Sequence, residues 1–156
     1  MIEEEMAKEP AIEEHEAAEN QALIAQFEQG RTPEGFHHAD HVRVAFAYIS
    51  EFPLLEALAR FPAALRRFAQ VQGKPGLYHE TITWAYLFLI AERIAISTRL
   101  PSWEEFSAQN PDVLVWRGGI VEKYYTKSTL NSDLARQRFV LPDRGFLDCA
   151  ILDGER

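Results

Sequence analysis

The chain has 156 residues, of which 47% are apolar and 12% aromatic, which is enough for one globular domain with a sizeable core. The formal net charge is −8, but eight acidic residues and only one basic residue, Lys8, fall within the first twenty positions. The rest of the chain is nearly neutral and gives no sign of the basic surface that nucleic-acid binding requires, so nucleic acid is not expected as a partner.

The N-terminus, the short apolar runs and the single cysteine suggest a cytoplasmic protein. Met1-Ile2-Glu3-Glu4-Glu5 lacks the basic and apolar regions of a secretory signal. The longest apolar run, Trp84 to Ala91, is far shorter than the roughly 20 residues of a membrane span, so no membrane partner is expected. Cys149 is the only cysteine, which excludes an internal disulfide and makes cysteine an improbable main metal ligand.

Helical spacing dominates the first half of the sequence. Residues 1–11 lack this spacing and are predicted to form a disordered acidic arm, whereas residues 12–156 are predicted to form a single helical domain. Helices are expected at about residues 12–29, 37–52 and 54–72. Pro62 falls inside the third, so this segment is predicted either to kink or to split into two helices.

The second half begins with the most apolar helix, expected at about residues 79–99 and therefore predicted to be central. Ser102 and Glu105 form a capping-box pattern for a short helix. Asn110-Pro111 opens another short helix, and a last one is expected at about residues 128–138. Residues 139–152 are predicted to be an extended tail over apolar surface. The predicted fold class is all-α, a single-domain bundle of about five to seven helices with an extended C-terminal tail.

Four of the five histidines lie in two short segments, residues 36–43 and 78–81. His38 and His41 are three residues apart on the apolar face of one predicted helix, and His79 opens another. Neutral imidazole is a common ligand of transition metals, and three protein ligands with one open position are typical of a reactive metal site. The sequence therefore predicts that His38, His41 and His79 bind a divalent transition metal such as zinc, nickel or iron.

Two acidic residues adjoin these histidines. Asp40 and Glu80 are predicted to transfer protons, to orient the imidazole rings or, for one of them, to bind the metal directly. Acids in a first helical turn also interact favourably with the helix dipole, which is the alternative role for Asp40. Arg43 either binds an anionic substrate or pairs with Asp40. Tyr78, Tyr86 and the pair at 124–125 either line a pocket or belong to the core.

Three segments resemble recurring blocks in a family of small, uncharacterised bacterial proteins that are all-helical: residues 36–43, 78–84 and 139–144. The resemblance covers most of residues 30–145. The first block matches the pattern Phe-x-His-x-x-His-Val-Arg, which would make His38 and His41 the matched pair. We associate no established reaction with this family, so the resemblance favours particular residues without implying a function.

Two functions follow as hypotheses. The first is a metal-dependent enzyme that acts on a small-molecule substrate through the three histidines. The second is a non-catalytic helical protein that binds a structural metal, acts as a sensor or holds a partner. A pocket beside the histidines would favour the first, whereas histidines that are hydrogen-bonded to backbone carbonyl groups would favour the second.

Overall fold

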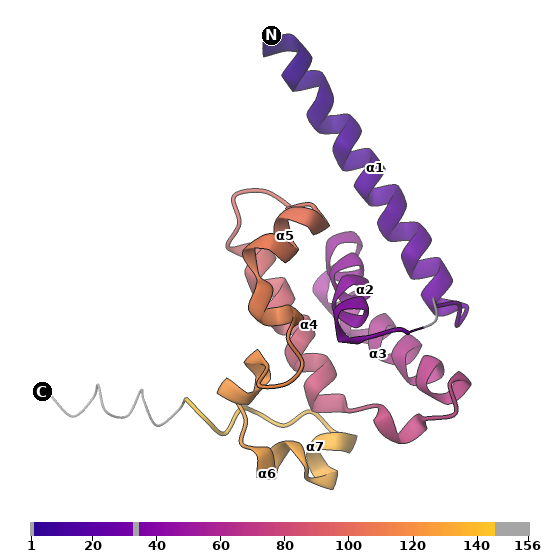
Figure 1. The fold of residues 1–156 in the computed structure, drawn as a ribbon, viewed down its shortest axis with the longest axis vertical. Helices are drawn as coiled ribbons and strands as arrows, with labels where there is room; N and C mark the ends of the chain where they lie inside the picture. The colour runs from indigo at the N-terminus through magenta and orange to yellow at the C-terminus, as the bar shows by residue number, and fades with distance from the viewer. Residues whose placement is uncertain (1, 33–34, 146–156) are drawn as a thin grey trace, which may run out of the picture.

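The computed structural model describes residues 2–32 and 35–145. Within them the chain forms seven α-helices and three short 3-10 helices, with no strand, which confirms the predicted all-α fold class (Figure 1). None of the helices in these two ranges is both long and apolar enough for a membrane span. The elements are α1 (Ile2–Glu28), α2 (His38–Glu51), α3 (Leu54–Val71), η1 (Pro75–Leu77), α4 (Glu80–Ala95), α5 (Trp103–Gln109), η2 (Pro111–Leu114), η3 (Ile120–Lys123), α6 (Lys127–Leu130) and α7 (Asp133–Gln137).

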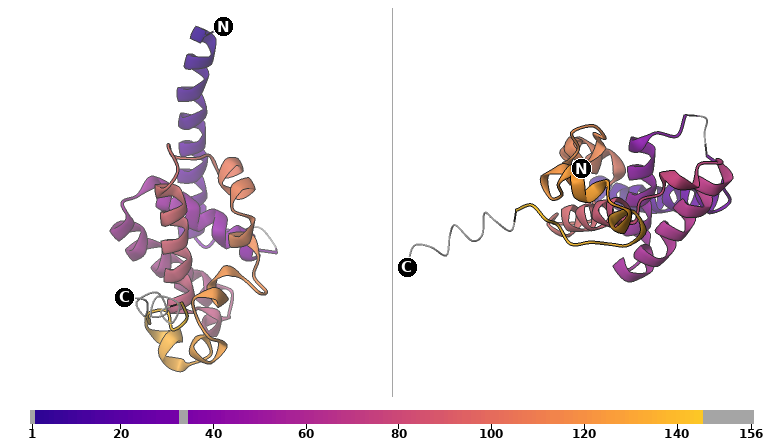
Figure 2. Two further views of the ribbon diagram at one scale, coloured as in Figure 1. Left: turned by 90° about the vertical axis from the view of Figure 1, so that its left-hand side faces the viewer. Right: turned by 90° about the horizontal axis from the view of Figure 1, so that it is seen from below.

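Helix α1 begins at Ile2 instead of at about Ile12, so the acidic segment has a helical backbone where an irregular arm was expected. Its N-terminal half projects beyond the other helices (Figures 1 and 2). The C-terminal half packs on α2 and buries Asn20, Ile24 and Phe27. This packing explains why only the second half has apolar residues at helical spacing. The mobility of the acidic segment in solution stays a prediction.

Helix α3 runs without interruption through Pro62, so the two-helix alternative is wrong. Proline removes one backbone donor from a helix and crowds the preceding turn. Here Phe61, Pro62 and Ala64 are all buried, and the burial of this face offsets the lost hydrogen bond.

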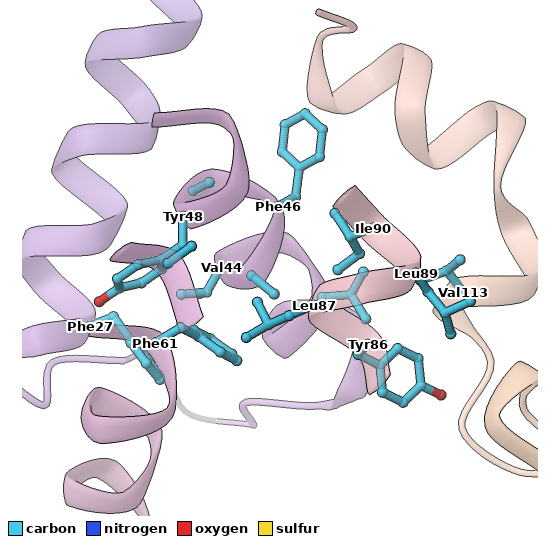
Figure 3. Packing of buried hydrophobic residues seen from close by; sticks show 14 of the residues in the cluster. Phe27, Val44, Phe46, Tyr48, Phe61, Tyr86, Leu87, Leu89, Ile90 and Val113 are labelled. Carbon is cyan, nitrogen blue, oxygen red and sulfur yellow. The ribbon is translucent and has the colours of Figure 1, made fainter. Parts of the chain in front are cut away.

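Helix α4 is central, as its composition predicts, although it ends at Ala95 and not near Arg99. It contacts α2, α3 and α7. Phe46 of α2 and Leu87 and Ile90 of α4 are fully buried in the core between the helices (Figure 3). Burial of this apolar surface is the main favourable contribution to folding.

Polar residues cap the first turns of the short C-terminal helices. Ser102 and Glu105 form both hydrogen bonds of the predicted capping box at the start of α5. The single helix expected at residues 128–138 is instead two helices, α6 and α7. Ser132 accepts a hydrogen bond from the Ala135 backbone N–H and so starts a new helix at Asp133.

The described part of the predicted tail, residues 139–145, lies beside α4 without regular structure, as expected. Phe139 stacks on Trp84 with 5.4 Å between the ring centroids. Asp143 accepts hydrogen bonds from the hydroxyl groups of Thr126 and Thr129, at 2.7 and 2.6 Å, and these bonds lower its pKa to about 2. The remainder of the predicted tail, residues 146–152, lies outside the described residues.

Phe46 provides a direct test of this core. Replacing it with alanine removes a fully buried ring that packs on Phe106, so F46A should lower the free energy of unfolding by about 3–5 kcal/mol. L55A is the matched control on the surface, because Leu55 is 82% exposed, and it should change stability by less than about 0.5 kcal/mol. Urea unfolding followed by circular dichroism measures both, and equal effects would contradict the packing described here.

Candidate functional site

The three histidines predicted as metal ligands line one pocket of about 790 Å³. The pocket lies between the first turns of α2 and α4 and the C-terminal half of α3. Its walls are largely apolar and include Phe36, Val42, Phe61, Leu65, Phe68 and Ile82. A concave apolar site of this volume with a few polar groups has the character of a small-molecule binding site.

His41 faces this pocket from the first turns of α2. Its ring lies 4.3 Å from the ring centroid of Phe36 and 6.1 Å from that of Phe68, and no described residue forms a hydrogen bond with it. Burial, and to a smaller extent the neighbouring His38 ring, lower the pKa of His41 to about 4. The ring is therefore neutral at physiological pH and has a nitrogen lone pair available to a ligand.

His38 lies one turn earlier, and one of its ring nitrogens is already used. Nε2 is 3.0 Å from the backbone oxygen of Val113. Because a carbonyl oxygen only accepts hydrogen bonds, Nε2 carries the proton and Nδ1 keeps its lone pair. Burial lowers the pKa of His38, which keeps this ring neutral.

His79 has both ring nitrogens engaged. Nε2 donates to the backbone oxygen of Leu130 at 2.7 Å, while Nδ1 accepts from the Ile82 backbone N–H at 3.2 Å. The second bond makes His79 the N-cap of α4. A metal bound by His79 would have to replace one of these bonds, so the assignment of His79 as a third ligand stays a prediction.

The described residues contain no group of three or more His, Cys, Asp or Glu side chains placed to hold a metal ion. Asp40 is exposed, and its carboxylate accepts a hydrogen bond from the His37 backbone N–H at 2.8 Å. Glu80 accepts hydrogen bonds from Arg66 and from the Tyr78 hydroxyl group. Both acids are therefore hydrogen-bonded to other groups, and neither lines the pocket. Their roles in proton transfer stay predictions.

The aromatic residues divide between two sites. Tyr78 and Tyr86 line the histidine pocket, whereas Tyr124 and Tyr125 line a smaller cavity of about 180 Å³ beside the tail. Trp116 also lines the histidine pocket, and its ring centroid lies 5.2 Å from that of His38. Sequence reasoning missed this residue, although an aromatic side chain beside the Gly118-Gly119 pair is a signal of an exposed functional loop.

Arg43 contacts residues of α1 and α5 and forms no ion pair with Asp40 among the described residues, and its role in binding an anionic substrate stays a prediction. Its guanidinium group donates to Asn20 at 2.7 Å and lies 3.9 Å from the carboxylate of Glu16. It also stacks over Trp103 at 5.3 Å. Arg43 therefore connects α1 to α2 and α5 and does not line the pocket.

Comparisons with protein families, with curated proteins and with solved structures found no match to this chain. The resemblance to the family of small bacterial helical proteins accordingly stays a prediction.

The low pKa of His41 predicts how stability depends on pH. The unfolded chain binds a proton at His41 near pH 6.5, whereas the folded protein binds it only near pH 4. Acidification between these values therefore favours unfolding. H41F keeps a ring but cannot be protonated, so it should lose roughly 2 kcal/mol less stability than the parent between pH 7 and pH 4.5. Urea unfolding at both pH values tests this, and equal losses would contradict the burial of a neutral His41.

Proposed function

We propose that the protein binds a small, largely apolar molecule in the histidine pocket. The observation that carries this proposal is that apolar side chains from α2, α3 and α4 enclose about 790 Å³ beside two neutral histidines. Pockets for small molecules commonly have about 300–1,000 Å³ and a few polar groups among apolar walls.

Several polar groups in this pocket are available to orient the ligand. Three of them are the His41 ring, Nδ1 of His38 and the hydroxyl group of Tyr86, and no described residue forms a hydrogen bond with that hydroxyl group. Burial raises the pKa of Tyr86 to about 12, so its hydroxyl group stays protonated and can donate. The two histidine lone pairs can accept, so polar atoms of a largely apolar ligand can find hydrogen-bond partners on these walls.

A bulky residue in the pocket tests this proposal. Ala69 lines the pocket and Ala59 is exposed on the same helix, α3. The neutral fluorophore 1-aminoanthracene should bind the parent protein with about one equivalent at saturation, and A69W should weaken this binding roughly tenfold or more. A69L should have an intermediate effect, and A59W, which introduces the same side chain outside the pocket, should have none.

Fluorescence titration measures the binding, and circular dichroism checks that each variant is folded. Equal binding by the parent, A69W and A59W would exclude this pocket as the binding site.

A second candidate function is a metal-dependent reaction on the same small molecule. The support is that His38 and His41 are neighbouring, neutral and on the pocket wall, because neutral imidazole is the form that ligates metals. The pair alone does not make a complete site, since a metal centre usually has at least three protein ligands and His79 is hydrogen-bonded at both nitrogens.

Elemental analysis of protein purified without chelator tests the metal. A site that includes His79 predicts about one equivalent of transition metal in the parent and none in H38A, H41A or H79A. Metal retained only in H79A would assign it to the His38 and His41 pair. No loading of the parent by zinc, nickel or iron(II) would remove this second candidate and leave the binding proposal in place.

The proposed setting is a cytoplasmic protein of bacterial origin with a small molecule as its ligand and without a nucleic-acid partner. The lack of a basic pattern in the sequence supports only the last of these points, that nucleic acid is not a partner. Enzymatic activity is part of the second candidate alone.

A further inference from the structure

The charged residues around the histidine pocket are unevenly distributed. Among the described residues that line the pocket none is acidic, and Lys74 is the one that carries a charge at neutral pH. Lys74 precedes η1, at the edge of the pocket where Leu77 and Tyr78 also lie. The pocket therefore combines apolar walls with a positive charge at one edge.

A second cation, Arg136, does not line the pocket but contacts η1 next to this edge. Arg136 of α7 donates a hydrogen bond to the backbone oxygen of Gly76 at 2.9 Å, which brings its guanidinium group to η1. Arg136 is also close enough to His79 to contribute to the lowering of the pKa of that ring. No described carboxylate forms an ion pair with either Lys74 or Arg136.

The nearby Arg66 differs from these two cations because Glu80 neutralises it. Its guanidinium group pairs with that carboxylate and stacks over the Tyr78 ring at 4.7 Å. The surplus positive charge at η1 therefore belongs to Lys74 and Arg136. The chain as a whole has a formal charge of −8, so this local surplus runs against its overall charge.

We propose that the ligand of the pocket is an apolar molecule that ends in a carboxylate, with its charged end at Lys74 and Arg136 and its apolar body between α2, α3 and α4. This inference rests on the proposed function, because it specifies the ligand of the same pocket. A carboxylate accepts hydrogen bonds from both an ammonium and a guanidinium group. The apolar walls supply most of the affinity, and the two cations supply the preference for the acid.

Dodecanoate and dodecanol test the ligand class, because they share an alkyl chain and differ in charge. Dodecanoate should bind the parent protein more tightly than dodecanol. K74Q and R136Q should each weaken dodecanoate binding roughly twofold to fivefold, as expected for partly exposed ion pairs, and leave dodecanol binding unchanged. K123Q is the matched control, since Lys123 is exposed on η3 and does not line the pocket.

Displacement of 1-aminoanthracene measures both ligands, and raised salt should weaken the binding of dodecanoate alone. Equal binding of the acid and the alcohol, with no effect of K74Q or R136Q, would overturn the ligand class and leave the pocket as a binding site. Displacement by neither ligand, together with equal 1-aminoanthracene binding by the parent and A69W, would overturn the proposed function as well.

Discussion

The first turn of α4 is the constraint on which the arrangement of the C-terminal third depends. Thr81 is fully buried, and its hydroxyl group donates to the backbone oxygen of Arg138 at 2.8 Å and accepts from the Val140 N–H at 3.2 Å. His79, two residues earlier, holds the end of α6 through the Leu130 oxygen. A buried polar group costs free energy unless it forms a hydrogen bond. These bonds therefore hold the end of α6 and the first residues of the tail in place. The tail and α6 are therefore positioned by side chains of α4.

These bonds also determine which histidine is available in the pocket. His79 uses both of its nitrogens for structure, and His38 uses one to hold η2 through the Val113 oxygen. His41 contacts aromatic rings and forms no hydrogen bond with a described residue. The three histidines thus line one cavity but differ in how many of their ring nitrogens are free of hydrogen bonds to described residues. The pocket and the backbone bonds, which were expected to favour opposite hypotheses, occur together.

The sequence predicts the helices better than the bonds between them. Apolar spacing locates α2, α3 and α4, and the histidines at two helix starts, which the sequence groups together, line one pocket. The partners of His38 and His79 lie 75 and 51 residues away along the chain, in the short helices η2 and α6. No local rule links an imidazole to a particular distant carbonyl oxygen. The split between α6 and α7 is different, because Ser132 is a local capping signal that helical spacing alone overlooks.

The loop that brings Trp116 to the pocket depends on two glycines, Gly118 and Gly119. Gly118 has a φ of +62°, a conformation that side chains disfavour. A Cβ atom on Gly119 would lie 2.6 Å from the backbone oxygen of Val115 and 2.9 Å from that of Trp116, so only glycine allows the chain to turn back so closely. This turn follows Trp116, which is 57% exposed and lies beside His38. An exposed aromatic side chain on the pocket wall has an unfavourable apolar surface in water, and a ligand that covers it removes that surface from solvent.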